Sequence, residues 1–293
     1  MSIGRVGMTA DGRRPRVSYL LCSTPRSGST MLCELLEATG VAGHPQEFFQ
    51  QVASTGMPRR PLEYFGDAVT PEIRAAVGAD DRSSADHRGY APAVHGGFGA
   101  YLESVLRRGT TPNGVFGAKL MWGYVDGLVT ALRELPGVGD RPAPEALALA
   151  FGEPRYMWVR RRGTDRQAVS LWRALQTWAW RSEGDDRGDG RDGGDAVYLF
   201  DAIDALERSL RADDAAWERF FAEAGVEPAT IVYEDFSADP AAGTRALLGR
   251  LGVESDVPDG PRTERQADER SEEWVRRYRA ERDRALSAAS GDR

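Results

Sequence analysis

The chain has 293 residues and a formal net charge of −7, with 41% hydrophobic and 28% charged residues. This balance is typical of a globular protein, and the acidic excess argues against nonspecific binding to nucleic acid. No apolar run approaches the roughly 18 residues of a membrane-spanning helix. Residues 1–16 lack the apolar core of a secretory signal, so we expect a flexible N-terminal tail and a cytoplasmic protein. Cys22 and Cys33 lie in apolar segments and suggest neither a disulfide framework nor a metal site.

Hydrophobic periodicity predicts strands that alternate with helices. The expected strands cover residues 17–22, 115–122, 155–160 and 229–234. The first expected helix places Leu32, Leu35, Leu36 and Thr39 on one face and ends at Gly40. The other expected helices cover residues 98–107, 126–135, 145–151, 165–178 with Asp165 as an N-cap, 196–225 as one long helix or a helix pair, and 240–251. Such alternation favours an α/β fold with a parallel sheet.

The remaining segments are rich in Pro, Gly or charge. Residues 51–99 contain only short helical patterns and are interpreted as a lid or substrate-facing excursion. Residues 184–195 have low complexity and predict a flexible surface loop. The sequence from Glu264 onward is charged and partly helical. No linker divides the chain, so we expect one domain over residues 17–285 and a C-terminal tail over 286–293.

The segment STPRSGST, residues 23–30, connects the first expected strand to the first expected helix. In a parallel α/β sheet, such a loop lies at the carboxyl end of its strand, where free amides at the helix N-terminus bind anions. Gly28 allows close approach of the backbone, Arg26 supplies a permanent charge, and Ser27, Ser29 and Thr30 supply hydroxyl groups. The Walker A pattern is not matched, because no lysine precedes Ser29. An ordinary N-capped turn remains an alternative.

Only one of the 38 basic Lys and Arg residues is a lysine, Lys119, in the expected strand VFGAKLMW. Arginine elsewhere is typical of a chain from a GC-rich genome. The position of Lys119 suggests a site that needs a compact ammonium group. Chance, or a structural ion pair, would leave the same pattern.

TPRSGST resembles the phosphosulfate-binding loop of sulfotransferases that use 3′-phosphoadenylyl sulfate (PAPS). A second motif of those enzymes is an arginine after a strand and a serine eight residues later, which together bind the 3′-phosphate. Arg162 and Ser170 match this motif. A donor with a 3′-phosphate at one end and a phosphosulfate at the other needs two anion sites. The resemblance implies a P-loop-like parallel sheet flanked by helices, PAPS as co-substrate, PAP as product, and no metal.

Four further segments resemble the bacterial trehalose 2-sulfotransferase family, over roughly residues 17–285. They are RSGSTMLCELLEATGVAGHPQEFFQ, TPNGVFGAKLMW, AVSLWRALQT and ERQADERSEEWVRRYRAER. The resemblance implies that Glu47, in PQEFF, is the general base for a hydroxyl acceptor. It also implies a homodimer. Lys119, in a strand of the same sheet, is a candidate to stabilise the leaving oxygen, with a structural ion pair as the alternative. Arg265 is a candidate to cover the adenosine phosphates, with a solvated helical face as the alternative.

The acceptor side departs from the family pattern at four positions. The family has Gln, Glu, Pro and Trp where this chain has Pro25, His44, Arg59 and Tyr64. Because unmatched polar contacts are penalised strongly, these changes favour a different carbohydrate, a glycolipid or a secondary metabolite as the acceptor. The expected acceptor-binding residues are Pro25, His44, Gln46, Phe48, Phe49, Gln50, Arg59 and Tyr64. The alternatives are trehalose itself, a small-molecule P-loop kinase, and a nucleotide-binding protein without activity.

Overall fold

The computed structural model describes residue 7 and residues 14–50, 60–78, 96–177, 196–257 and 269–291. The chain divides into two compact units that are interleaved in sequence. The first unit comprises Met1–Arg59, Ala85–Arg160 and Asp213–Arg262, and the second comprises Arg60–Ser84, Arg161–Ala212 and Thr263–Arg293. The single domain expected over residues 17–285 stays a prediction. The expected loop at 184–195 lies outside the described residues.

The first unit is built on a parallel sheet with the order β2-β1-β3-β4. Its strands are β1 (Val17–Ser23), β2 (Val115–Met121), β3 (Arg155–Arg160) and β4 (Ala229–Val232). The fourth strand is shorter than expected, because Tyr233 begins the one-turn helix α9 (Tyr233–Phe236). The prediction of an α/β fold with a parallel sheet flanked by helices is confirmed.

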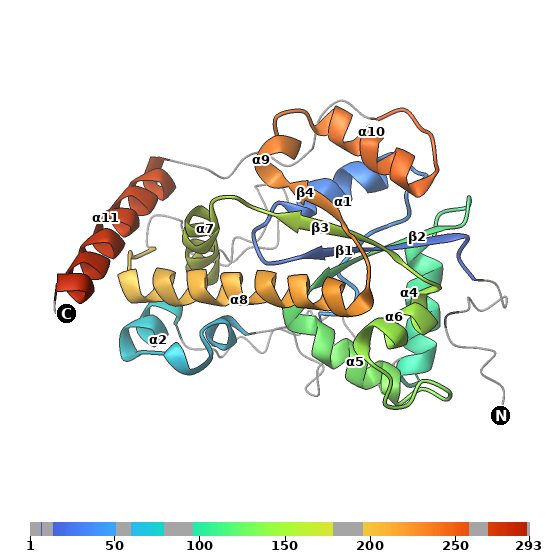
Figure 1. Ribbon diagram of the computed structural model, residues 1–293, viewed down its shortest axis with the longest axis horizontal. Coiled ribbons are helices and arrows are strands. Elements are labelled where there is room, and N and C mark those ends of the chain that lie inside the picture. The colour runs from blue at the N-terminus through green and yellow to red at the C-terminus, as the bar shows by residue number, and fades with distance from the viewer. Residues whose placement is uncertain are drawn as a thin grey trace. The chain divides into compact units, whose positions relative to one another are not determined.

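Helices cover both faces of this sheet (Figure 1). One face packs against α1 (Ser29–Ala38) and α10 (Pro240–Leu251), through a core that contains Tyr19 and Leu21 of β1. The other face packs against α4 (Phe98–Gly109), α5 (Val125–Arg133), α6 (Ala143–Phe151) and the second half of α8 (Phe200–Ala224). Alternate residues of β1 therefore face different cores, as the two-residue period of a strand requires.

The second unit is helical within its described residues. It contains the short helices η1 (Pro61–Tyr64), η2 (Gly66–Ala68) and α2 (Pro71–Val77), together with α7 (Thr164–Thr177), the first half of α8 and α11 (Glu269–Gly291). Trp172, Ile203 and Tyr278 are fully buried in its core. Asp165 lies inside the first turn of α7 and is not its N-cap, since the helix begins at Thr164. Helix α11 continues to Gly291, through most of the predicted tail.

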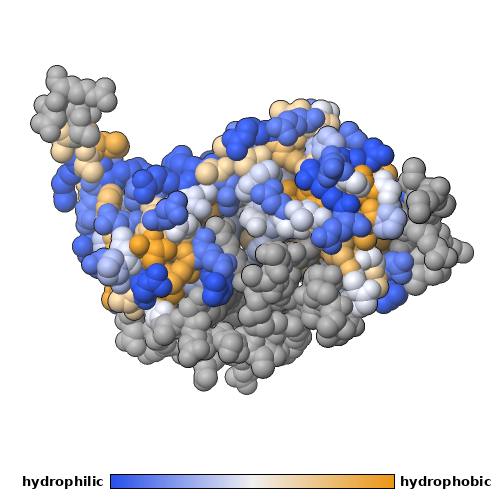
Figure 2. Space-filling view, turned by 90° about the horizontal axis from the view of Figure 1, so that it is seen from below, coloured by the Kyte–Doolittle hydropathy of each residue, from blue (hydrophilic) through white to orange (hydrophobic). Residues whose placement is uncertain are grey.

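The described surface is mainly hydrophilic on the face shown in Figure 2, with separate small hydrophobic patches. Among the described helices, none is both long and apolar enough to cross a bilayer.

Candidate active site

The segment of residues 23–30, here called the anion loop, connects β1 to α1, and its backbone is unusual at two positions. Arg26 has a φ of 62° and Gly28 a φ of 91°, both in the left-handed region. A Cβ atom built on Gly28 would lie 2.1 Å from Cδ2 of Tyr233, the first residue after β4. Glycine at this position is therefore required both by backbone strain and by the tyrosine ring.

The polar groups of this loop are arranged around the start of α1. Its N-cap residue is Gly28, which provides no side-chain hydrogen bond to the first-turn amides. Ser27 is fully buried, and its hydroxyl group has no hydrogen-bond partner among the described residues. Ser29 is also buried, whereas Arg26 and Thr30 are half-buried. Donors without an internal partner at a helix N-terminus are suited to an anionic ligand.

Glu47 and Lys119 form an ion pair beside this loop. The backbone at Gln46 bridges Ala118 in parallel, and the Lys119 amide donates to the Gln46 carbonyl oxygen at 3.0 Å. This register brings Glu47 Oε2 to 2.9 Å from Lys119 Nζ. The Glu47 side chain is 21% exposed and the Lys119 side chain 9%. The carboxylate is thus held by one cation while remaining accessible to solvent.

The sheet register places this pair near the loop. Lys119 pairs with Leu21, two residues before β1 and β2 both end at the paired residues Ser23 and Met121. The chain continues from Ser23 directly into the anion loop. The carboxyl edge of the sheet therefore carries the predicted anion loop, a carboxylate and the single lysine of the chain.

The thiol of Cys33, on α1, lies within the electrostatic reach of this pair. Burial raises the pKa of Cys33 to about 12, with a lowering contribution from Lys119 and a raising contribution from Glu47. A thiol with so high a pKa stays protonated at neutral pH and is a poor nucleophile. Cys33 is therefore not a candidate nucleophile at this edge of the sheet.

The predicted acceptor residues near Glu47 differ in their surroundings. His44 is half-buried, and its Nδ1 lies 3.1 Å from Glu37 Oε1. Phe49 packs edge-on against Phe151, with 5.7 Å between ring centroids. Both contacts belong to the body of the first unit. They support the backbone on either side of Glu47.

The other predicted acceptor residues of the first unit range from buried to exposed. Phe48 is buried beneath the Arg108 guanidinium, and its carbonyl oxygen accepts a hydrogen bond from Tyr101. Gln46 is exposed, Gln50 is half-buried, and Pro25 is buried in the anion loop. Of these positions, only the side chains of Gln46 and Gln50 combine polarity with access to solvent.

The remaining predicted residues belong to the second unit or lie outside the described residues. Tyr64 is buried in η1 of the second unit, and Arg59 and Arg265 lie outside the described residues. Arg162 is exposed two residues beyond the end of β3, and Ser170 is half-buried on α7, both in the second unit.

Sequence reasoning missed two aromatic residues that shape the anion loop. Tyr233 closes over Gly28, as described above. The Trp217 indole Nε1 donates to the carbonyl oxygen of Ser23 at 3.1 Å and fixes the end of β1. Trp217 lies 194 residues from Ser23, so no local pattern could have revealed the contact. Tyr233 did carry a signal, because it lies at the end of the last expected strand of the sheet.

The model of the Stf0 sulphotransferase family matches residues 18–281. The chain belongs to this family. The match runs through segments of both compact units. The predicted family and the enzyme class, a sulfotransferase, are therefore confirmed, and the P-loop kinase alternative is not supported.

Two curated relatives cover most of this Stf0 sulphotransferase. The chain is 39% identical over 264 residues to "Trehalose 2-sulfotransferase" of Mycobacterium tuberculosis (strain ATCC 35801 / TMC 107 / Erdman), which covers 90% of this chain and 94% of the relative. It is 38% identical over 263 residues to the protein of the same name from Mycolicibacterium smegmatis (strain ATCC 700084 / mc(2)155), with 89% and 94% covered. A solved structure of a sulfotransferase from Alicyclobacillus acidocaldarius superposes with a TM-score of 0.44 and 12% identity, over 88% of this chain and 89% of that chain.

Proposed function

We propose that this sulfotransferase moves a sulfuryl group from PAPS to a hydroxyl group of a sugar or glycoside, with Glu47 as the general base. The observation that carries the proposal is the ion pair between Glu47 Oε2 and Lys119 Nζ, 2.9 Å apart beside the anion loop. An accessible carboxylate next to an anion-binding loop can accept a proton from a hydroxyl group as its oxygen attacks the bound anion.

The anion loop fits the phosphosulfate end of the donor. The buried Ser27 hydroxyl, which has no partner in the described part of the chain, would donate to an anionic oxygen. The amides at the start of α1 and the Arg26 guanidinium would add charge complementarity. We assign the 3′-phosphate at the other end of the donor to Arg162 and Ser170, with Arg265 as a further contact.

In the proposed reaction, the acceptor oxygen forms a bond to sulfur while its proton passes to Glu47. The bond between sulfur and the bridging oxygen breaks, and its electron pair stays on the phosphate of PAP. The ion pair supports Lys119 as the group that orients the Glu47 carboxylate before the transfer. When Glu47 gains the proton, the ammonium group becomes available to stabilise the leaving oxygen.

We propose a carbohydrate acceptor because both curated relatives are named trehalose 2-sulfotransferases. The four departures from the family pattern, at Pro25, His44, Arg59 and Tyr64, favour a glycolipid or a glycosylated secondary metabolite over free trehalose. The pairing of His44 with Glu37 supports this view, since the imidazole already has a polar partner within the protein.

Nucleotide binding by calorimetry tests the donor assignment. PAP should bind without added metal, and at least tenfold more tightly than adenosine 5′-monophosphate, which lacks the 3′-phosphate. Arg162→Ala should remove most of this preference. Equal affinity of the wild-type protein for the two nucleotides would contradict the donor assignment, as would magnesium-dependent release of ADP from ATP.

A further inference from the structure

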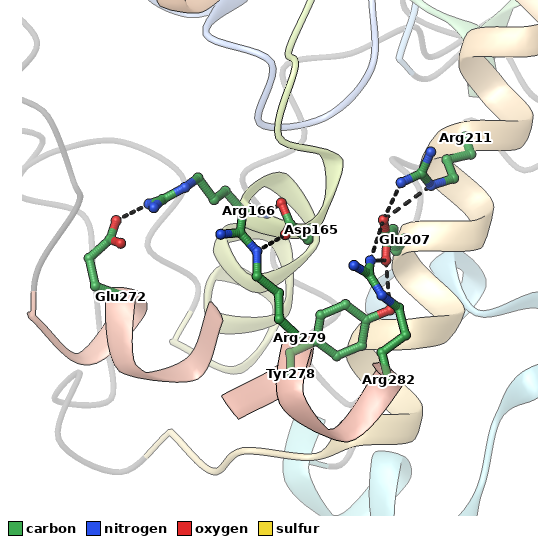
Figure 3. Close-up of polar contacts among 8 residues, drawn as sticks. All are labelled: Asp165, Arg166, Glu207, Arg211, Glu272, Tyr278, Arg279 and Arg282. Carbon is green, nitrogen blue, oxygen red and sulfur yellow. Dashed lines mark hydrogen bonds and ion pairs between the residues drawn. The ribbon is translucent and has the colours of Figure 1, made fainter. Parts of the chain in front are cut away.

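Helix α11 is attached to the first turn of α7 by two ion pairs (Figure 3). Arg279 Nε lies 2.5 Å from Asp165 Oδ2. Two turns earlier on α11, Glu272 forms an ion pair with Arg166 of α7. The N-terminal turn of α7 is therefore held from outside by a helix more than 100 residues later in the chain, since Asp165 and Arg279 are separated by 114 residues.

A second attachment joins α11 to α8 through the buried carboxylate of Glu207. The Tyr278 hydroxyl donates to Glu207 Oε2 at 2.6 Å, and Arg282 Nη1 lies 3.3 Å from the same oxygen. Arg211, one turn along α8, donates to Oε1 at 2.6 Å. This cluster fixes α11 independently of its contacts with α7 (Figure 3). A change at Arg279 alone should therefore leave the helix in place.

Asp165 lies in sequence between Arg162 and Ser170, the two residues assigned to the 3′-phosphate. A negatively charged side chain is unusual between two residues that bind an anion. It is 7% exposed, so its charge is poorly screened by water. Burial raises the pKa of Asp165, but hydrogen bonds from Arg279 and from the Arg166 amide outweigh that effect, and the pKa lies below its usual range. The carboxylate is thus ionised at neutral pH. Without a neighbouring cation, its charge would repel a phosphate bound at Arg162 and Ser170.

The face of α7 that carries Ser170 also lies against α11. Arg166, Ser170 and Arg173 are spaced by four and three residues and so share one helical face. The arginines on either side of Ser170 bind the first turn of α11, Arg166 through Glu272 and Arg173 through the Ser271 hydroxyl at 2.5 Å. Helix α11 therefore sets the orientation of this face as well as neutralising Asp165.

We propose that Arg279 is a positioning residue for the donor, which neutralises Asp165 so that Arg162 and Ser170 can bind the 3′-phosphate. This inference rests on the proposed function, because it uses the assignment of Arg162 and Ser170. It adds a residue of α11 that does not contact the nucleotide and yet determines how strongly its 3′-phosphate is bound.

The test compares affinities for PAP and adenosine 5′-monophosphate by calorimetry. Arg279→Met should weaken PAP binding about tenfold and change the affinity for the monophosphate less than twofold, because only PAP carries the 3′-phosphate. Arg277→Met is the matched control, since Arg277 lies on the same helix and pairs with Glu281, 2.8 Å away on α11. It should leave both affinities unchanged. Equal weakening of both nucleotides by Arg279→Met would overturn the proposal.

Removing the opposing charge separates the electrostatic role from a merely structural one. Adding Asp165→Asn to Arg279→Met should restore most of the lost PAP affinity, whereas a structural role predicts no recovery. Asp165→Asn alone should keep or increase PAP affinity, and this nearly isosteric variant carries the test if Arg279→Met does not fold. A loss of PAP affinity in Asp165→Asn would overturn the proposal. A wild-type protein without preference for PAP would refute the donor assignment instead.

Discussion

Two carboxylates, Glu47 in the first unit and Glu207 in the second, show how different surroundings suit different roles. Glu207 has a side chain that is 5% exposed, and it accepts hydrogen bonds from Tyr278, Arg211 and Arg282. Glu47 is 21% exposed and has one ion-pair partner among the described residues. The oxygens of Glu207 are therefore committed to holding helices together. Glu47 retains acceptor capacity for a proton from a substrate, which is what a general base needs.

The largest expected effect comes from removing the charge of Glu47. Glu47→Gln keeps the shape of the side chain but cannot accept a proton, so kcat should fall about a thousandfold. The Kd for PAP should stay within twofold of the wild-type value. Steady-state kinetics and calorimetry on the same preparation measure the two quantities. A parallel loss of PAP binding would mean that Glu47 is as structural as Glu207.

Lys119→Met tests the partner of the base. The variant loses the ammonium group that pairs with Glu47 and, in the proposed reaction, stabilises the leaving oxygen, so kcat should fall about a hundredfold. The KM for the acceptor should change less than threefold, because Lys119 is nearly buried and offers little contact surface. An unchanged kcat would show that the ion pair is only structural.

The two ends of α1 give a comparison within the first unit. Gly28→Ala introduces a methyl group that collides with Tyr233 at a φ of 91°, and it should lower the free energy of unfolding by about 2–3 kcal/mol. It should also weaken PAP binding at least tenfold. Gly40→Ala has a φ of 68° but meets no atom within 4 Å, so it should cost about 1 kcal/mol and leave PAP binding unchanged. Similar effects of the two variants on PAP binding would argue against the anion loop.

Glu207→Gln should affect stability and leave chemistry intact. Loss of the buried charge leaves two arginines and a tyrosine with a weaker acceptor, which should lower the free energy of unfolding by about 2 kcal/mol. The kcat should remain within twofold of the wild-type value. Denaturant unfolding provides the first measurement. A large fall in the kcat of fully folded Glu207→Gln would show that Glu207, like Glu47, is needed for the reaction.

The smallest effect concerns acid stability. The pKa of Asp165 is lowered in the folded protein, so its contribution to stability is present above the ordinary aspartate pKa of about 3.9 and is lost as the pH falls further. Asp165→Asn should reduce stability at pH 7 by about 1 kcal/mol and flatten its decline below pH 4. Urea unfolding at a series of pH values checks this. Parallel curves for the two proteins would contradict it.

The fold and the anion loop could be predicted because their signals are local. Each strand is a short apolar run, and the loop is a contiguous set of small and hydroxyl residues between a strand and a helix. The end of β4 was misjudged, since Tyr233 and Glu234 look like a continuing strand and instead form a helical turn. Asp165 was expected as an N-cap, and the observed helix begins at Thr164.

The sequence identified individual candidate residues of the site but not the contacts between them. Glu47 and Lys119 were both named from the sequence, but their pairing depends on the bridge between Gln46 and Ala118, which has no signal of its own. Asp165 and Arg279 are in contact although 114 residues separate them in sequence. Both lie in charged segments that resemble ordinary surface sequence. Contacts of this kind arise from tertiary packing, so they become visible only in the structure.

The most direct test of the account is a transfer assay with PAPS that carries a radioactive sulfuryl group. The purified protein is incubated with trehalose, other sugars, glycolipids and glycosylated metabolites, and the labelled products are identified by mass spectrometry. One carbohydrate hydroxyl should become labelled with stoichiometric release of PAP, and Glu47→Gln should abolish the labelling. Transfer that persists in Glu47→Gln, or PAP binding without transfer to any carbohydrate, would contradict it.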